Sequence, residues 1–199
     1  MIVKDLGVVD YLDTFKTMQT FTIQRDSETE NELWLLEHEP VFTQGLNGSD
    51  EHIFDTHTIP VVKADRGGQV TYHGRGQLIA YTLFDLKRYD IGVREMVSRL
   101  EKAVISFLAK QGIDAQSRQD APGVYVNDCK IASLGLRVKR GCCYHGVSIN
   151  IDMDLTPFSY INPCGYQGME MIDLKSLNIN MTMDEAKQQF VAALKSQMQ

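Results

Sequence analysis

Short apolar runs with a spacing of two residues, separated by turns, constrain the fold of this chain more than any other feature. In the clearest run, Val147, Ile149 and Ile151 alternate with polar residues, which predicts a half-buried strand. Similar runs occupy residues 33–36, 61–63, 69–72, 78–84, 124–126 and 131–138. Strands and helices do not alternate regularly, which disfavours a doubly wound nucleotide-binding fold. The pattern predicts an α+β fold with a mixed, largely antiparallel sheet packed with helices.

Three segments have apolar residues at helical spacing instead. The longest such pattern covers residues 93–111, and Gly112 follows where a helix-ending residue with positive φ is expected. Thr182 and Glu185 form a capping-box pattern at the start of a second helix, which is expected to close the chain. Apolar residues between 11 and 18 share one face of a predicted N-terminal helix.

Length and charge limit the classes of partner. The chain has 199 residues, with 20 Lys and Arg against 26 Asp and Glu, which gives a net charge of −6. This size predicts one domain over residues 1–199, and the acidic balance disfavours nucleic acid as a partner. No window has the 18 or so apolar residues of a membrane span, and the first residues show no basic and apolar leader pattern. We therefore expect a cytoplasmic protein.

Residues 66–77, Arg-Gly-Gly-Gln-Val-Thr-Tyr-His-Gly-Arg-Gly-Gln, combine four glycines with two arginines and a histidine. Glycine lets the backbone approach a ligand closely, and polar side chains can then orient that ligand. The same segment is equally compatible with a β-hairpin whose turn is Gly74-Arg75-Gly76. It has neither a Walker sequence nor the Gly-x-Gly-x-x-Gly spacing of dinucleotide sites, so phosphate binding has no specific support.

Four cysteines are too few for a disulfide scaffold in a chain of this length. Cys164 differs from the others because Pro163 fixes φ before it and Gly165 frees the backbone after it, which predicts a tight turn that presents the thiol. A reactive thiolate at neutral pH needs a cation, a helix N-terminus or a base close by. The remaining three are interpreted as bystanders: Cys129, Cys142 and Cys143.

Other polar residues allow two interpretations each. Cys142 and His145 have a Cys-x-x-His spacing, but no second paired motif completes a zinc site, so no metal is predicted. His73 either orients a substrate or is an ordinary histidine at a strand end. Three cations form either a docking patch for an acidic partner protein or protection of a sheet edge against aggregation: Arg137, Lys139 and Arg140.

Four motifs follow one another in a fixed order along the chain. They are Arg66-Gly-Gly with Thr71-Tyr-His73-Gly and Gly76-Gln77, then Lys130-Ile-Ala-Ser-Leu-Gly135, then His145-Gly146, and last Asn162-Pro-Cys164-Gly-Tyr. An earlier segment reads Glu37-His-Glu-Pro-Val-Phe-Thr-Gln-Gly45. In their order, and in the 34-residue separation of Lys130 from Cys164, these segments resemble the lipoyl(octanoyl) transferase family. The resemblance runs from about residue 33 to about residue 177.

The resemblance implies a fold shared with the catalytic domains of biotin and lipoate protein ligases. It also implies transfer of an octanoyl group from octanoyl-acyl carrier protein to a specific lysine of lipoyl domains, without ATP or any other cofactor. The acceptors would be the lipoyl domains of 2-oxoacid dehydrogenases and the glycine cleavage H protein. Cys164 matches the nucleophile that forms an acyl thioester, and Lys130 matches the residue that stabilises its thiolate.

The resemblance further implies substrate contacts in three segments. These contacts fall on Arg66, Gly67, Gly68, Gln69, Val70, Thr71, Tyr72 and His73, on Ser133, Leu134 and Gly135, and on Gly146, Val147 and Ser148. Two positions depart from the family pattern: Arg75 stands where Pro is usual, and Thr82 follows Tyr81 where Pro is common. Arg75 leaves the conformation of the glycine-rich segment open, because a residue with locked φ has become a flexible cation.

Several functions remain compatible with the sequence. An ATP-dependent lipoate or biotin protein ligase would share the fold, although Cys164 in its Pro-Cys-Gly turn argues against it. A cysteine hydrolase would use His73 or His145 as its base. A non-catalytic module that binds lipoyl domains is a third alternative. Within the transferase reading, backbone N–H groups near Leu134 and Gly135, or near Gly165, are the candidate oxyanion donors.

Overall fold

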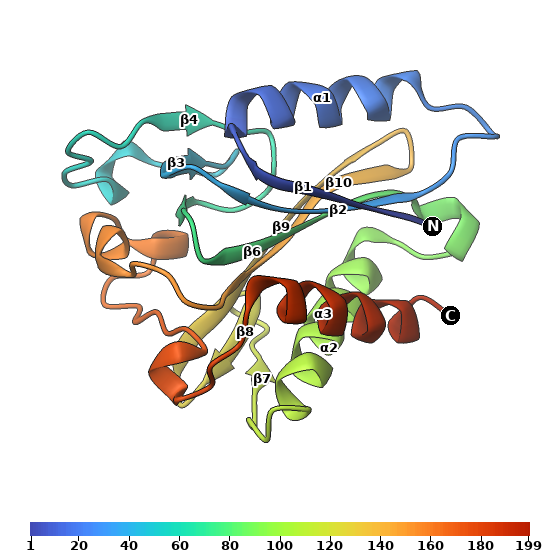
Figure 1. Ribbon diagram of the computed structural model, residues 1–199. Helices are drawn as coiled ribbons and strands as arrows, with labels where there is room; N and C mark the ends of the chain where they lie inside the picture. The colour runs from blue at the N-terminus through green and yellow to red at the C-terminus, as the bar shows by residue number, and fades with distance from the viewer.

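Two sheets of different size form the framework of the protein (Figure 1). The computed structural model describes residues 1–199. The strand order in the larger sheet is β1 (Ile2–Val9), β2 (Glu32–His38), β6 (Gln77–Asp85), β10 (Cys142–Asn150), β9 (Cys129–Lys139), β8 (Gly123–Val126) and β7 (Gln116–Ser117). The smaller sheet consists of β4 (Val61–Lys63), β3 (Val41–Gln44) and β5 (Val70–His73). Only β1 with β2 and β3 with β4 pair in parallel, which confirms the predicted α+β fold.

Helices cover both faces of the larger sheet. Helices α2 (Val93–Ala109) and α3 (Met183–Gln197) lie together on one face, where Phe190 joins the main apolar core. Helix α1 (Tyr11–Gln24) lies on the opposite face and buries Phe15 in a second core. Figure 1 shows this order of layers, with α1 above the sheet and α2 and α3 below it.

All three predicted helices are confirmed, with small differences at their ends. The capping box of α3 is present, since Thr182 Oγ1 accepts the N–H of Glu185 and the Glu185 carboxylate accepts the N–H of Thr182. Helix α2 ends at Ala109, two residues earlier than expected. Gly112 follows with φ +76, the left-handed conformation predicted for it.

The sequence pattern missed three strands, each for a physical reason. The residues of β1 are mostly exposed at the sheet edge, so no buried face imposes a period of two. Strand β3 is buried on both faces, and its residues include Thr43 and Gln44 beside two apolar ones. Strand β7 has only two residues, which is too short to show any period.

The prediction that the strand ending near Asn150 is half-buried is wrong. Its polar residues are as buried as its apolar ones, with Ser148 5% and Asn150 1% exposed. The Asn150 side chain accepts a hydrogen bond from Gln77 Nε2 at 2.9 Å and donates to the Ile172 carbonyl at 2.9 Å. The alternating residues of β10 therefore face an apolar core on one side and a buried polar layer on the other, so neither face is exposed to bulk water.

The hairpin interpretation of residues 66–77 is also wrong, because β5 and β6 belong to different sheets. Their connecting turn requires glycine at position 76, where φ is +82 and a Cβ would lie 1.8 Å from the Asp152 carbonyl oxygen. Arg75 lies exposed in this turn and pairs with Glu39, while the Glu37 carboxylate accepts the Gly76 N–H at 2.7 Å. The arginine is thus accommodated at the surface, outside the pocket described below.

Short helical turns complete the chain and support the segment that carries Cys164. They occupy Asp50–His52, Leu86–Tyr89, Thr156–Tyr160, Pro163–Gly165 and Lys175–Leu177. A small core packs Phe42 and Tyr72 of the smaller sheet against Phe158, so the approach to Cys164 is anchored on that sheet. No helix of the protein combines the length and apolarity needed to cross a membrane.

Candidate active site

Cys164 lies in a left-handed turn. Its φ is 57° and that of Gly165 is 80°, within the short turn that begins at Pro163. A left-handed backbone costs roughly 1–2 kcal/mol for a residue other than glycine. The turn is held by the Gly165 N–H on the Asn162 carbonyl at 2.9 Å and by the Asn162 N–H on the His52 carbonyl at 2.8 Å. The structure thus has the tight turn that the flanking proline and glycine predict.

Lys130 lies against this turn, with its Nζ 3.0 Å from Cys164 Sγ. The lysine is fully buried near the start of β9. The backbone N–H of Lys130 donates to the Glu170 carbonyl at 2.8 Å, and its backbone carbonyl accepts the Ile172 N–H at 3.0 Å. Gly123 makes room for the side chain, since a Cβ there would lie 2.3 Å from Lys130 Cε. The chain that follows the cysteine turn therefore returns to hold the lysine in place.

The Lys130 ammonium has no carboxylate partner. It takes part in none of the protein's ion pairs, and the centroid of the Tyr125 ring lies 5.4 Å from its Nζ. Glu101 interacts with it only through space, because that carboxylate accepts the Gly123 N–H. A buried cation is costly unless a negative group compensates it. The thiol of Cys164 is the group in direct contact with the ammonium that can carry negative charge.

The other three cysteines lack this arrangement. Burial raises the pKa of the Cys143 thiol to about 11, and its Sγ donates to the Thr82 carbonyl at 3.3 Å. Burial also raises the pKa of Cys142, with Asp85 adding to the effect, and that of Cys129, with Glu170 adding to it. These environments favour the neutral thiol, as expected for bystanders.

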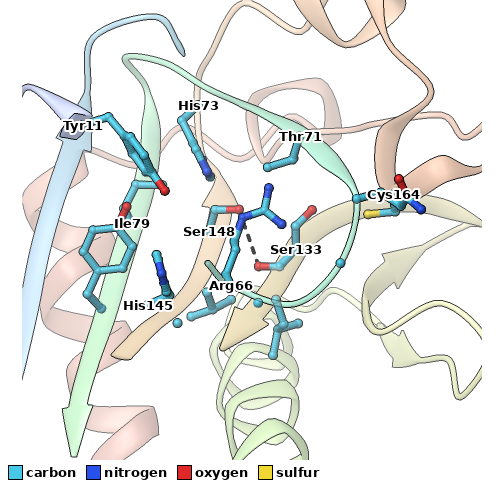
Figure 2. Close-up of a pocket in the computed structure, with 16 residues that line it drawn as sticks. Tyr11, Arg66, Thr71, His73, Ile79, Ser133, His145, Ser148 and Cys164 are labelled. Carbon is cyan, nitrogen blue, oxygen red and sulfur yellow. Dashed lines mark hydrogen bonds between the residues drawn. The ribbon is translucent and has the colours of Figure 1, made fainter. Parts of the chain in front are cut away.

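A pocket extends from Cys164 between the two sheets and the start of α1 (Figure 2). It has about 510 Å³ of empty volume, counting its open mouth. Most of the expected substrate-contacting residues line it: Arg66, Gly68, Gln69, Thr71, His73, Ser133, Leu134, Gly135, Gly146, Val147 and Ser148. The structure brings these residues together from β5, β9 and β10 and from the loop before β5.

Three of the expected contact residues do not line the pocket. Val70 and Tyr72 alternate with the pocket-facing residues of β5 and point into the small core behind it. The N–H of Gly67 donates to the Leu136 carbonyl at 3.1 Å, which fixes the loop onto β9. Val70 and Tyr72 face away because a strand presents only every second side chain to one side, and the loop bond turns Gly67 to β9. Substrate contact by these three residues stays a prediction.

Arg66 brings a second buried cation to the pocket. One terminal nitrogen donates to the carbonyl of Thr43 at 2.6 Å and to its hydroxyl at 2.8 Å, and the other donates to the Gly67 carbonyl at 2.9 Å. Burial lowers the pKa of the guanidinium from its usual range. All its hydrogen-bond partners are neutral, so the guanidinium adds a positive charge that no hydrogen-bonded carboxylate offsets.

Two buried histidines beside the pocket are neutral. The Nδ1–H of His73 donates to Gln77 Oε1 at 2.7 Å, and its Nε2 accepts from the Thr43 hydroxyl at 3.3 Å. The Nδ1–H of His38 donates to the Val9 carbonyl, and its Nε2 accepts from Tyr81 Oη at 2.7 Å. Burial lowers the pKa of His73 to about 3 and that of His38 to about 4.

His145 also faces the pocket, although its position in β10 would place it on the other side. Its φ is 61°, and this left-handed backbone turns the ring to the face of Tyr144, on which it stacks with centroids 5.0 Å apart. Asp65 holds both rings: it accepts from His145 Nε2 at 2.9 Å and from the Tyr144 hydroxyl. These hydrogen bonds lower the pKa of Asp65 to about 2 although burial opposes them.

Sequence reasoning placed no pocket role on several residues that line it. Tyr11, Ile79 and Tyr81 are pocket residues that look like ordinary core positions in a sequence. The sequence marks His145 as part of the His145-Gly146 motif and as a possible base or zinc ligand, but its hydrogen bond to Asp65 has no sequence signal. No group of three or more His, Cys, Asp or Glu side chains is arranged to hold a metal ion.

The fold matches that of lipoyl and biotin protein ligases. A lipoate-protein ligase A solved with bound ATP superposes with a TM-score of 0.83 over 99% of this chain and 85% of its own length, at 13% identity. A biotin protein ligase from Aquifex aeolicus gives a TM-score of 0.59 over 100% of this chain and 69% of its own, at 11% identity. The chain therefore has the fold that these ligases share.

Sequence comparison narrows this class to one family. Residues 10–195 match the family described as the lipoyl protein ligase A/B catalytic domain. An octanoyltransferase of Chromobacterium violaceum is 58% identical over 185 residues, 93% of this chain and 89% of that protein. One of a Marinomonas species is 54% identical over 198 residues, 100% of this chain and 92% of that protein. The chain belongs to the octanoyltransferases of the lipoyl protein ligase A/B family, which are acyltransferases.

Proposed function

We propose that residues 1–199 form one catalytic domain that transfers an octanoyl group from octanoyl-acyl carrier protein to a specific lysine of lipoyl domains. The observation that carries this proposal is the 3.0 Å contact between Lys130 Nζ and Cys164 Sγ at one end of the pocket. An ammonium beside a thiol supplies both the charge that stabilises a thiolate and a proton for a leaving group. The acyl group would travel as a thioester on Cys164.

In the first half-reaction the Cys164 thiolate attacks the carbonyl carbon of the donor thioester. The tetrahedral intermediate collapses by breaking the bond to the carrier's sulfur, which leaves with a proton from the Lys130 ammonium. One thioester replaces another, so no ATP is needed. The acyl chain would lie in the pocket beside apolar groups such as Ile79, Leu134 and Val147.

In the second half-reaction the acceptor lysine attacks the Cys164 thioester as a neutral amine. The neutral Lys130 amine takes the proton released as the carbon–nitrogen bond forms, and Cys164 leaves as a thiolate. Both groups return to their starting states, so the cycle balances without a cofactor. The oxyanion would be met by backbone N–H groups near Leu134 and Gly135, because the Gly165 N–H already donates to Asn162.

The acceptors we propose are the lipoyl domains of 2-oxoacid dehydrogenases and the glycine cleavage H protein, and the donor is an acidic carrier protein. Because the chain itself has a net charge of −6, an acidic donor needs a local positive surface. The β9–β10 hairpin offers such a surface through its exposed cations: Arg137, Lys139 and Arg140.

Two observations weigh against the other functions. A hydrolase would need a histidine on the thiol, but His73 is bonded to Gln77 and Thr43, and His145 to Asp65. A non-catalytic module would have no structural need for a buried lysine without a carboxylate. The shared fold is the one observation that supports an ATP-dependent ligase. The experiment below distinguishes a ligase from the transferase.

The test mixes the protein with octanoyl-acyl carrier protein and an unmodified lipoyl domain, without ATP, and weighs all three by mass spectrometry. We expect the octanoyl group to move from the carrier to the lipoyl domain. Modification only when ATP and free octanoic acid are supplied would establish the ligase instead. Release of octanoic acid with no acceptor present would establish the hydrolase.

A further inference from the structure

Buried aromatic residues line the end of the pocket opposite Cys164: Tyr11, Tyr81 and His145. In Figure 2, Tyr11, Ile79 and His145 lie on one side of the pocket and Cys164 on the other. The strand register gives the same order, since Lys130 contacts the cysteine near the start of β9, whereas His145 pairs with Leu136 six residues further along that strand. An acyl chain that starts on the cysteine and follows the pocket therefore points toward these aromatic residues.

Tyr11 is held rigidly there. It is the first residue of α1 and only 3% exposed. Its ring lies 5.9 Å from that of Phe15, 6.2 Å from that of His73 and 5.2 Å from that of His38, measured between centroids. Packing on three sides restrains the ring against displacement by a ligand.

The Tyr11 hydroxyl is buried and has no hydrogen-bond partner in the protein. The nearby Tyr81 Oη already donates to His38, and the Arg66 guanidinium already donates to Thr43 and Gly67. Burial raises the pKa of Tyr11 to about 12, so the hydroxyl keeps its proton at neutral pH and remains a donor. A water molecule or a polar ligand atom in the pocket could pair with it.

We propose that the Tyr11 hydroxyl sets the longest acyl chain that the pocket accepts. This inference rests on the proposed acyl transfer. A chain that ends short of Tyr11 leaves space for a water molecule on the hydroxyl. A longer hydrocarbon chain expels that water and offers no acceptor in its place, so the hydroxyl is left buried and unpaired. The Tyr11 hydroxyl thus discriminates against longer acyl chains through the cost of its own desolvation, in addition to the limit that the size of the pocket sets.

The test compares wild type with Tyr11→Phe, which removes only the unpaired oxygen and leaves the packed ring. For wild type we expect kcat/KM to fall about tenfold from octanoyl to decanoyl thioester donors, a factor typical of one buried hydroxyl left unpaired. For Tyr11→Phe the same ratio should shrink to about threefold or less. Calorimetry with octanoic and decanoic acids should show the same change in binding preference, which provides a readout that does not require turnover.

Thr71→Val is the matched control, because Thr71 Oγ1 is another buried pocket hydroxyl without a partner and Figure 2 places it nearer to Cys164. It should leave the ratio of octanoyl to decanoyl binding as in wild type. If Tyr11→Phe changes neither the turnover ratio nor the binding ratio, the proposal is overturned. A shift in the binding ratio without acyl transfer from any donor would keep Tyr11 as the selecting residue and refute the proposed function instead.

Discussion

Acidification should destabilise this protein well above the pH at which carboxylates are protonated. The cause is the neutral state of His38 and His73, whose folded pKa values are about 4 and about 3, against about 6.5 for an unfolded histidine. As the pH falls, these residues therefore bind protons at a higher pH in the unfolded chain than in the folded protein. Their contribution to stability is complete above pH 6.5 and is lost progressively as the pH falls toward the folded values.

The size of this loss follows from the distance between pH and the unfolded pKa. pH 5 is about 1.5 units below the unfolded pKa of 6.5, and both histidines are still largely neutral in the folded protein. Each histidine therefore lowers the free energy of unfolding by about 2 kcal/mol at this pH. The sum of about 4 kcal/mol is a large part of the 5–15 kcal/mol that usually separates folded from unfolded protein. Asp65, with its pKa at about 2, adds a further loss only below its unfolded pKa, near 4.

Urea unfolding at pH 7.5 and pH 5.0 measures this loss, and His38→Gln divides it between the two residues. A glutamine amide can donate to the Val9 carbonyl and accept from Tyr81, as His38 does, but it does not titrate. We expect the variant to lose about 2 kcal/mol less than wild type over this range. Equal losses in the two proteins, or an NMR titration of His38 or His73 above pH 6, would refute the reasoning.

The remaining predictions concern the two half-reactions and the donor. Lys130→Met should lower acyl transfer by at least the roughly hundredfold typical of a lost acid–base group. Alkylation of Cys164 by iodoacetamide should then accelerate at higher pH than in wild type, because the thiolate has lost its cation; an unchanged alkylation profile would leave Lys130 only a proton carrier. Neutralising the hairpin cations should weaken use of the carrier-bound donor, more so at low salt, and spare a small thioester donor. Equal losses on both donors would contradict a docking role for Arg137, Lys139 and Arg140.

Much of the fold could be predicted because local patterns and tertiary burial agree. The apolar run of β6 and the capping box of α3 are patterns that packing did not override. Prediction failed where burial does not follow the pattern, as in exposed β1 and in β10, whose polar residues are buried. The hairpin interpretation failed because a glycine turn looks the same whether it joins neighbours in one sheet or strands of two sheets.

The candidate site could be predicted only in part. The turn at Cys164 follows from the flanking residues, but its pairing with Lys130 came from resemblance, since 34 residues of spacing reveal no contact by themselves. Tyr11 looks like an ordinary apolar position of a helix, and only the finished packing leaves its hydroxyl unpaired. His145 faces the pocket only because its backbone is left-handed, a conformation that sequence does not reveal for a histidine.

The most direct test of the account is the mass of the intact protein after exposure to octanoyl-acyl carrier protein alone. We predict the addition of a single octanoyl group, removed by hydroxylamine and mapped by peptide analysis to Cys164. The same adduct should form when the other cysteines are replaced by serine or alanine: Cys129, Cys142 and Cys143. No adduct under conditions where an added lipoyl domain becomes octanoylated, or an adduct on one of those three thiols, would contradict a thioester intermediate on Cys164.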